Sequence, residues 1–140
     1  MMKKSVLASV PTANCPCGSG VGYAQCCAHF HNHLPAPSAE LLMRARYSAY
    51  VVHDLAFIIA TWHPTTRPAD LDREVDDRAT RWLGLDVLRH TQDGDRASVE
   101  FVARYKLAGR AERLHEVSRF VREAGWWWYL DGSFPEKKKG

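Results

Sequence analysis

Apolar residues recur at helical spacing through the middle of the chain. Ser38, a residue type common at helix N-caps, precedes apolar positions three or four residues apart: Leu41, Leu42, Ala45, Ala49 and Val52. A second helix is predicted over residues 54–62, where Asp54 can cap the start and Pro64 ends it. The face that this second helix buries would comprise Leu55, Ile58, Ile59 and Trp62.

From Leu83 onward the apolar period changes from 3.6 residues to two. The alternation predicts four strands, separated by glycine-containing turns, over residues 83–91, 97–107, 114–123 and 126–130. Residues 72–81, with alternating charges and good helix formers, predict a third and weaker helix. Helices followed by a meander of strands favour an α+β fold, in which a strongly curved antiparallel sheet wraps around the helices.

Length and composition fit one domain with a small appendage. The chain has 140 residues, of which 46% are hydrophobic and 25% charged, as in ordinary globular proteins. Prolines at positions 35 and 37 mark a linker. We therefore divide the chain into a flexible N-terminus (1–13), a cysteine-containing segment (14–34), a main domain (38–132) and a tail (133–140).

The four cysteines of the chain all lie within thirteen residues, as Cys15, Cys17, Cys26 and Cys27. A C-x-C pair followed by a C-C pair can supply the four thiolates of a tetrahedral zinc site. Glycines between the pairs allow the sharp turns that bring the pairs together. The spacing therefore predicts one structural zinc ion, and we call residues 14–34 the knuckle.

Other uses of the four thiols remain as alternatives. Two disulfides inside a thirteen-residue loop are sterically awkward, and residues 1–13 lack the sustained apolar run of a signal peptide. Redox thiols and an iron-sulfur centre are further readings, since ligand type alone does not exclude iron. His29, His31 and His33 follow Cys27, but four cysteines already complete a tetrahedral shell, so we expect these histidines to be solvated or supporting groups.

Charge and hydropathy argue against two classes of partner. The formal net charge of +3 would fall to about +1 with four thiolates and one zinc ion, and the basic residues are dispersed, so nucleic-acid binding is not expected. No stretch reaches the roughly 20 apolar residues of a membrane-spanning helix. We therefore expect no membrane span and a cytoplasmic location, which reduced cysteines also fit.

The knuckle resembles the SEC-C motif, first known at the C-terminus of the translocase ATPase SecA, where it binds zinc. The match includes all four cysteines together with Gly18, Ser19, Gly20 and Tyr23. SecA-type knuckles usually carry lysines between the cysteine pairs, which suit acidic partners. This chain has Val21, Gly22, Ala24 and Gln25 there, so binding to the acidic chaperone SecB or to ribosomes is not carried over.

The remainder resembles the YchJ-like family of bacterial proteins. The resembling segments are residues 42–50, 61–64, 81–85, 99–105 and 114–120, so the likeness spans nearly the whole chain. The resemblance implies a nuclear transport factor 2-like (NTF2-like) domain, a cone of three helices held in a bent sheet. Such cones host isomerases, dehydratases and plain binding modules, so the resemblance implies a fold more firmly than a function.

A cone would enclose a pocket between the sheet and the helices. His63, His115 and Glu116 are candidates for acid-base catalysis there, because a histidine or a tuned carboxyl can titrate near neutral pH. The predicted pocket lining comprises Trp62, Trp82, Glu100, Arg104 and Ser118, with the tryptophans as a wall for a flat ligand. The structural alternative is that the charged residues satisfy one another in cross-strand pairs.

Two functions are compatible with these residues. The favoured hypothesis is a zinc-binding adaptor, in which the knuckle contacts a protein partner and the cone binds that partner or a small ligand. The alternative is a small-molecule enzyme with isomerase-like or dehydratase-like acid-base chemistry in the cone pocket. A closed four-thiolate shell has no open position for water, so catalysis by the metal is not expected in either case.

Overall fold

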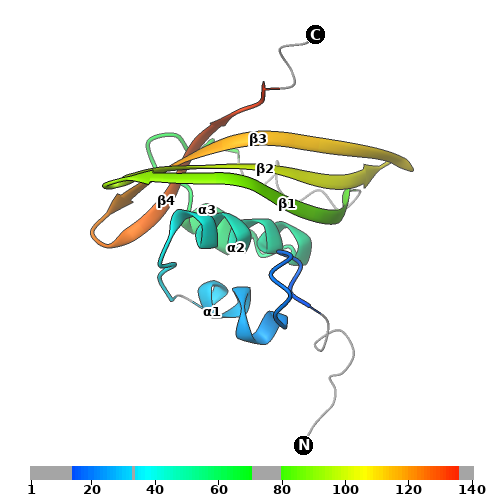
Figure 1. Ribbon diagram of the computed structural model, residues 1–140, viewed down its shortest axis with the longest axis horizontal. Helices are drawn as coiled ribbons and strands as arrows, with labels where there is room; N and C mark the ends of the chain where they lie inside the picture. Colours follow the sequence, from blue (N-terminus) through cyan, green and yellow to red (C-terminus); the bar gives the residue numbers. More distant parts are fainter. Residues whose placement is uncertain (1–13, 33, 71–79, 136–140) are drawn as a thin grey trace, which may run out of the picture.

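The computed structural model describes residues 14–32, 34–70 and 80–135. Its helical elements are η2 (Tyr23–Gln25), α1 (Cys27–His31), α2 (Ala39–Val52) and α3 (Leu55–Ala60). The strands are β1 (Thr80–Asp93), β2 (Arg96–Leu107), β3 (Arg110–Glu123) and β4 (Trp126–Ser133). Figure 1 shows three layers, with the sheet over α2 and α3, and α1 with the rest of the knuckle on the opposite side of these helices. The layers put α2 in the middle of the molecule.

The strands form one antiparallel meander in the order β1-β2-β3-β4. Two of its hairpins turn on an alanine and a glycine with positive φ, Ala108-Gly109 and Ala124-Gly125. Positive φ at both central residues is the type I′ geometry, whose twist matches that of the flanking strands. Register shifts in β1 and between β3 and β4 interrupt the regular pairing. Such irregularities bend a sheet, which here curves over the helices.

Helix α2 begins and ends at recognisable capping residues. The Ser38 hydroxyl accepts a hydrogen bond from the Leu41 backbone N–H at 3.2 Å, and His53 ends the helix in the left-handed conformation. Eight of its 14 residues are buried. Met43 and Tyr47 pack into the main core against the sheet, while Ala45 contacts the cysteines of the knuckle. The helix is therefore covered on two sides.

Helix α3 is shorter than the sequence predicts. Asp54 caps it by accepting from the Phe57 N–H at 3.1 Å, as expected, but the helix ends at Ala60. The following residues pair instead with β4, since the Tyr129 N–H donates to the Thr61 carbonyl and the His63 N–H donates to the Tyr129 carbonyl, each at 2.8 Å. Trp62 is thereby held across from Tyr129 at one end of the sheet.

The α+β fold, its curved antiparallel sheet and the two helices behind Ser38 and Asp54 are confirmed. The strands are longer than predicted, because the hairpin partners extend pairing into polar residues. The third helix expected over residues 72–81 falls largely outside the described residues, and its last two residues belong to β1. Within the described part of the chain, no helix reaches the length and hydrophobicity that a bilayer crossing requires.

Candidate functional site: a four-thiol cluster and a cone cavity

The knuckle folds as a small hairpin that brings its two cysteine pairs close together. Asn14 and Gly22 form a bridge, and the Cys15 N–H donates to the Val21 carbonyl at 2.7 Å. The reversal between them needs positive φ at Gly18 (85°) and Gly20 (83°), which glycine adopts without the steric cost of a side chain. The glycine-rich spacer thus does what the sequence suggests.

The four sulfur atoms form one cluster. All four Sγ atoms lie within 4.8 Å of one another, and the Sγ atoms of Cys17 and Cys26 are 3.7 Å apart. A zinc ion with Zn–S bonds of about 2.3 Å in a tetrahedron would separate its sulfurs by about 3.8 Å. The same distance is far longer than a disulfide bond, and all four cysteines are free thiols. The cluster therefore fits a single tetrahedral metal ion.

The thiols share hydrogen bonds that favour a negative charge on Cys17. Donation to Cys17, together with burial, raises the pKa of Cys15 to about 11. Hydrogen bonds from Cys15 and Cys27 lower the pKa of Cys17 far below the ordinary thiol value. Since Cys15, Cys17 and Cys27 are almost fully buried, ionising all of them requires a cation among them. A bound divalent metal ion would supply that charge.

His31 links the knuckle to the helix layer. Its Nε2 donates to the Ala45 carbonyl of α2 at 2.9 Å, so its Nδ1 accepts from the Tyr23 hydroxyl at 2.7 Å. The ring also contacts Phe57 of α3, with centroids 4.7 Å apart. His31 is therefore a supporting group, whereas His33 lies outside the described residues.

Arg44 makes a second link between α2 and the knuckle. Its Nη1 donates to the Cys17 carbonyl at 2.8 Å, and its Nε donates to Glu40 on the same helix. The knuckle is thus tied to α2 at two separate points, through the His31 side chain and through the Cys17 carbonyl.

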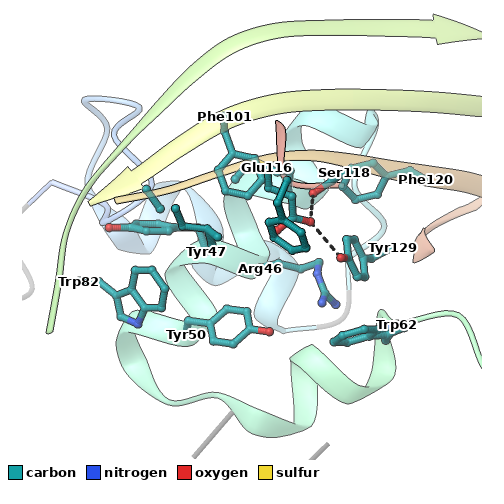
Figure 2. A pocket seen from close by; sticks show the side chains of 14 residues that line it. Arg46, Tyr47, Tyr50, Trp62, Trp82, Phe101, Glu116, Ser118, Phe120 and Tyr129 are labelled. Carbon is teal, nitrogen blue, oxygen red and sulfur yellow. Dashed lines mark hydrogen bonds between the residues drawn. The ribbon is translucent and has the colours of Figure 1, made fainter. Parts of the chain in front are cut away.

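A cavity of about 320 Å³ lies on the other side of α2, under the concave face of the sheet. This volume suits a small organic molecule. Figure 2 shows its walls, which are mostly aromatic: Tyr47, Tyr50, Trp62, Trp82, Phe101 and Phe120. Edge-to-face contacts hold several of these rings, such as Tyr47 against Trp82 with centroids 5.8 Å apart.

A buried carboxylate marks the polar part of the cavity. Glu116 on β3 is 7% exposed, and its Oε2 accepts from the Ser118 hydroxyl at 2.7 Å and from the Tyr129 hydroxyl at 2.9 Å (Figure 2). Glu116 and Ser118 share the cavity face of β3 with Leu114 and Phe120, as alternation predicts. The absence of a side chain at Gly132 leaves room for this carboxylate, because a Cβ there would meet Glu116 Cδ at 2.8 Å.

Arg46 is the buried cation of the same cavity. Its guanidinium lies over two aromatic rings, with Cζ 4.4 Å from the ring centroid of Tyr129 and 5.3 Å from that of Trp62. Its Nη1 donates to the Ile58 carbonyl at 3.0 Å and to the Thr61 hydroxyl at 2.6 Å. These contacts hold a charged group, 6% exposed, in a mostly apolar environment.

Burial changes the proton affinity of several groups here. Desolvation, reinforced by the neighbouring Glu116, raises the pKa of Tyr129 far above its ordinary value. Desolvation also raises the pKa of Tyr47 to about 12 and lowers the pKa of Arg46, against the attraction of Tyr50, Tyr129 and Glu116. Near neutral pH both tyrosines are therefore hydrogen-bond donors.

Of the predicted pocket residues, Trp62, Trp82, Glu116 and Ser118 line the cavity, and four others do not. His115 projects from the opposite face of β3, where its Nε2 lies 2.7 Å from Glu100 Oε2 on β2. His63 lies 3.1 Å from Glu123 Oε1, and Arg104 pairs with Asp86 at the surface. These residues, with Glu100, therefore lie outside the cavity, where each contacts a charged partner: His115 and Arg104 pair across strands, and His63 pairs from the segment after α3.

Sequence reasoning did not identify Arg46 and Tyr50 as cavity residues, and it placed Tyr129 only within the last predicted strand. Met43, Arg46, Tyr47 and Tyr50 follow the i, i+3, i+4, i+7 spacing of one helix face and line the cavity together. In a helix that is buried on two sides, large side chains occupy a second face in addition to the face that carries the regular apolar stripe. That pattern was available in the alternation of these residues with Leu42, Ala45 and Ala49.

The tryptophan-rich strand divides between two environments. Trp127 is 4% exposed in the main core, whereas Trp126 is 46% exposed. Residues 126–128 also line a smaller cavity of about 240 Å³, together with Phe30, Leu34 and Phe57. One edge of this cavity therefore belongs to the knuckle and the other to β4.

The fold and the cysteine cluster define a class: a cone-shaped domain with a four-cysteine motif packed against its central helix. Residues 38–132 match the YchJ_M-like family, described as the YchJ middle NTF2-like domain, and residues 12–28 match the SEC-C motif. The chain belongs to this YchJ-like, SEC-C-containing family, as its cysteine and strand motifs predict.

Relatives of known sequence and structure agree with this assignment. The chain is 57% identical to a UPF0225 protein of Ralstonia nicotianae, over 94% of this chain and 98% of the relative. It is similar to the solution structure of a SEC-C motif containing protein from Rhodopseudomonas palustris (TM-score 0.79, 35% identity, 87% of this chain and 98% of that one). A crystal structure of a SEC-C motif containing protein from Psychrobacter arcticus is also similar (TM-score 0.73, 29% identity, 87% and 82%).

Proposed function

We propose that this protein is a zinc-stabilised binding module whose cone holds a small organic ligand. The observation that carries the proposal is the cavity of about 320 Å³, with aromatic walls and a buried Arg46 and Glu116 inside it. Apolar pockets with a few convergent polar groups are the usual form of small-molecule sites. Burying two charged side chains is costly, so their retention in a ligand-sized cavity favours a role in recognition.

Binding is favoured over acid-base catalysis by the groups that face the cavity. None of the histidines in the described part of the chain lines it. The Tyr129 hydroxyl keeps its proton, because its pKa is raised, and Glu116 accepts two hydrogen bonds from protein donors. Groups held in this way orient a ligand well. The enzyme alternative therefore depends on Glu116 alone as the general base.

Zinc is the metal we propose for the knuckle. The four thiols suit a soft or borderline ion in tetrahedral geometry, and their sulfur spacing supports this. Its role would be structural, because four thiolates leave no coordination position for a substrate. By tying the knuckle together, zinc would support the side of α2 that lies opposite the cavity.

Location and partners are further parts of the proposal. Thiolate ligands persist in reducing compartments, which favours the cytoplasm. A protein partner at the knuckle stays a prediction. Residues 18–21 form an exposed tip of the knuckle, where Val21 is 45% exposed.

The cavity is tested by filling it. In Leu114→Trp the larger side chain enters the cavity from β3, whereas Val117→Trp places the same change on the opposite face of the same strand. We expect phenylacetate, phenylacetamide or phenethylamine to shift amide NMR signals of cavity residues in the metal-loaded wild type and in Val117→Trp. The shifts should be lost in Leu114→Trp. If none of the three compounds perturbs the wild type, or if Leu114→Trp responds like the control, the cone is not a small-ligand site.

A further inference from the structure

The guanidinium of Arg46 has more hydrogen-bond donors than the described residues use. Both of its hydrogen bonds leave from Nη1, to Ile58 and Thr61. Nη2 and Nε, which carry three further N–H bonds, make no hydrogen bond with the described residues. No carboxylate among those residues forms an ion pair with Arg46, although it is 6% exposed. A buried cation in this position lacks a direct counter-ion.

Trp62 supplies another donor beside it. The indole Nε1 is buried and has no hydrogen-bond partner among the residues that the structure describes. Its ring stacks on Arg46 and lines the same cavity. A buried N–H without an acceptor costs free energy, so this atom and the guanidinium both favour an acceptor from outside the chain. In Figure 2 the Arg46 guanidinium projects into the space bordered by Tyr50 and Trp62.

The rest of the cavity suits a flat apolar body. Beyond Arg46 the walls are rings, with Tyr47 and Trp82 on one side and Phe101 above (Figure 2). Glu116 is not the complementary anchor, since its Oε2 already accepts from Ser118 and Tyr129. The Arg46 guanidinium and the Trp62 indole N–H can therefore donate to an anionic group, and the aromatic walls can pack against a planar ring.

We propose that the cavity binds a small aromatic carboxylate, with its carboxylate on Arg46 and the Trp62 indole N–H and its ring against Tyr47 and Trp82. This proposal rests on the proposed function, that the cone holds a small ligand, and adds the chemical class. A guanidinium can meet a carboxylate through two parallel N–H bonds, which also fixes the direction of the ring. Release of the ligand would leave the Nη2 and Nε donors of Arg46 and the Trp62 indole N–H without an acceptor among the described residues.

The test compares three phenyl compounds that differ mainly in charge. Phenylacetate is anionic, phenylacetamide neutral and phenethylamine cationic, and each is titrated into the metal-loaded full chain while NMR follows the Trp62 indole N–H signal. We expect phenylacetate to bind about tenfold or more tightly than the other two, as charge-assisted hydrogen bonds predict. We also expect it to move the Trp62 indole signal downfield.

Variants separate the two donors from general packing. Arg46→Met should weaken phenylacetate binding about tenfold and leave phenylacetamide nearly unchanged. Trp62→Phe, which keeps a ring but removes the N–H, should weaken phenylacetate binding by a smaller factor of about three to ten. It also serves if Arg46→Met does not fold. Arg104→Met is the matched control, because Arg104 lies outside the cavity beside Asp86, and it should bind like the wild type.

The outcomes distinguish this proposal from the proposed function. Equal or tighter binding of phenylacetamide or phenethylamine would overturn the carboxylate assignment and leave the small-ligand function standing. Undiminished phenylacetate binding in folded Arg46→Met, or in Trp62→Phe if the arginine variant does not fold, would overturn it too. Binding of none of the three compounds would count against both.

Discussion

At the scale of single residues, two glycines on the sheet illustrate how a missing side chain determines a site. Gly132 on β4 leaves the space into which the Glu116 carboxylate fits, because the carboxylate packs directly against the backbone of Gly132. Gly84 on β1 leaves space for the guanidinium end of Arg104, whose side chain is 48% exposed. The Glu116 carboxylate is held by Ser118 and Tyr129 inside the core, whereas the end of Arg104 can move into solvent.

Gly132→Ala should therefore be much more harmful than Gly84→Ala. The new Cβ would force Glu116 away from its two donors, and we expect a loss of about 1–3 kcal/mol in the free energy of unfolding. Gly84→Ala, which displaces only the half-exposed end of Arg104, should change it by about 0.5 kcal/mol or less. Urea denaturation of the metal-loaded proteins measures both. Equal losses in the two variants would contradict the role assigned to Gly132.

The buried tyrosines predict a loss of stability in alkali. Burial raises the pKa of Tyr47 from 10.0 to about 12, and the pKa of Tyr129 is raised as well. Above pH 10 the unfolded chain therefore releases these protons before the folded chain does, so the free energy of unfolding falls as pH rises. We expect a decline of roughly 1 kcal/mol per pH unit for each of the two tyrosines between pH 10 and 12.

Replacement by phenylalanine checks the origin of this decline. Tyr47→Phe and Tyr129→Phe keep the rings but remove the ionisable hydroxyls, so both should flatten the curve of unfolding free energy against pH in the alkaline range. Thermal unfolding followed by circular dichroism at several pH values measures the slope. A slope identical to that of the wild type in both variants would assign the alkaline decline to other groups.

At the scale of elements, apolar periodicity predicts the two faces of β3 correctly but identifies only one of the two buried faces of α2. The alternation along β3 puts Glu116 and Ser118 on one face with Leu114 and Phe120, and these four residues line the cavity. The same alternation separated His115 from them. Its pairing with Glu100 was not readable from β3 alone, because it depends on the register between β3 and β2.

Helix α2 was predicted from a single apolar stripe. The structure buries two faces, since Ala45 lies against the cysteine cluster while Arg46 and Tyr47 line the cavity. Local sequence does not reveal which of two apolar faces meets a ligand cavity, because the facing layer comes from residues more than 30 positions away. Arg46 was missed for this reason.

At the scale of the whole molecule, the knuckle, the helices and the sheet depend on α2 as their shared layer. His31 and Arg44 connect the knuckle to this helix through hydrogen bonds to backbone carbonyls. The knuckle itself is too small to bury enough apolar surface for independent folding. Its order should therefore come from the metal, and the side of α2 that contacts it should depend on the metal too.

Metal removal tests this dependence. We expect about one equivalent of zinc in the purified chain by elemental analysis, and we expect a strong chelator to lower the Tm by about 10 °C or more, because metal-binding energy contributes to folding energy. Hydrogen exchange should accelerate first in η2 and α1. A chain carrying Cys26→Ser and Cys27→Ser should already melt at the lower temperature and should not respond to the chelator.

Ser19→Ala provides the matched control for the cysteine changes. Its hydroxyl lies 3.2 Å from the Cys26 sulfur, but it is not one of the four thiols. This variant should keep its zinc and most of its stability. Identical melting curves for the wild type with and without metal would contradict a structural role for the ion, and iron in place of zinc would correct its identity.

The sequence by itself determined the main helices and strands, the apolar face of each strand and the four-thiol cluster. These features depend on local spacing: a helical or alternating period, capping residues, and cysteines separated by a short glycine-rich spacer. The tertiary structure alone decided which polar residues meet in the cavity. Arg46, Glu116 and Tyr129 come from three elements, and their approach depends on strand register, on the short pairing of residues 61–63 with β4, and on the space left at Gly132. Such long-range relations are set by packing between layers, which no local pattern encodes.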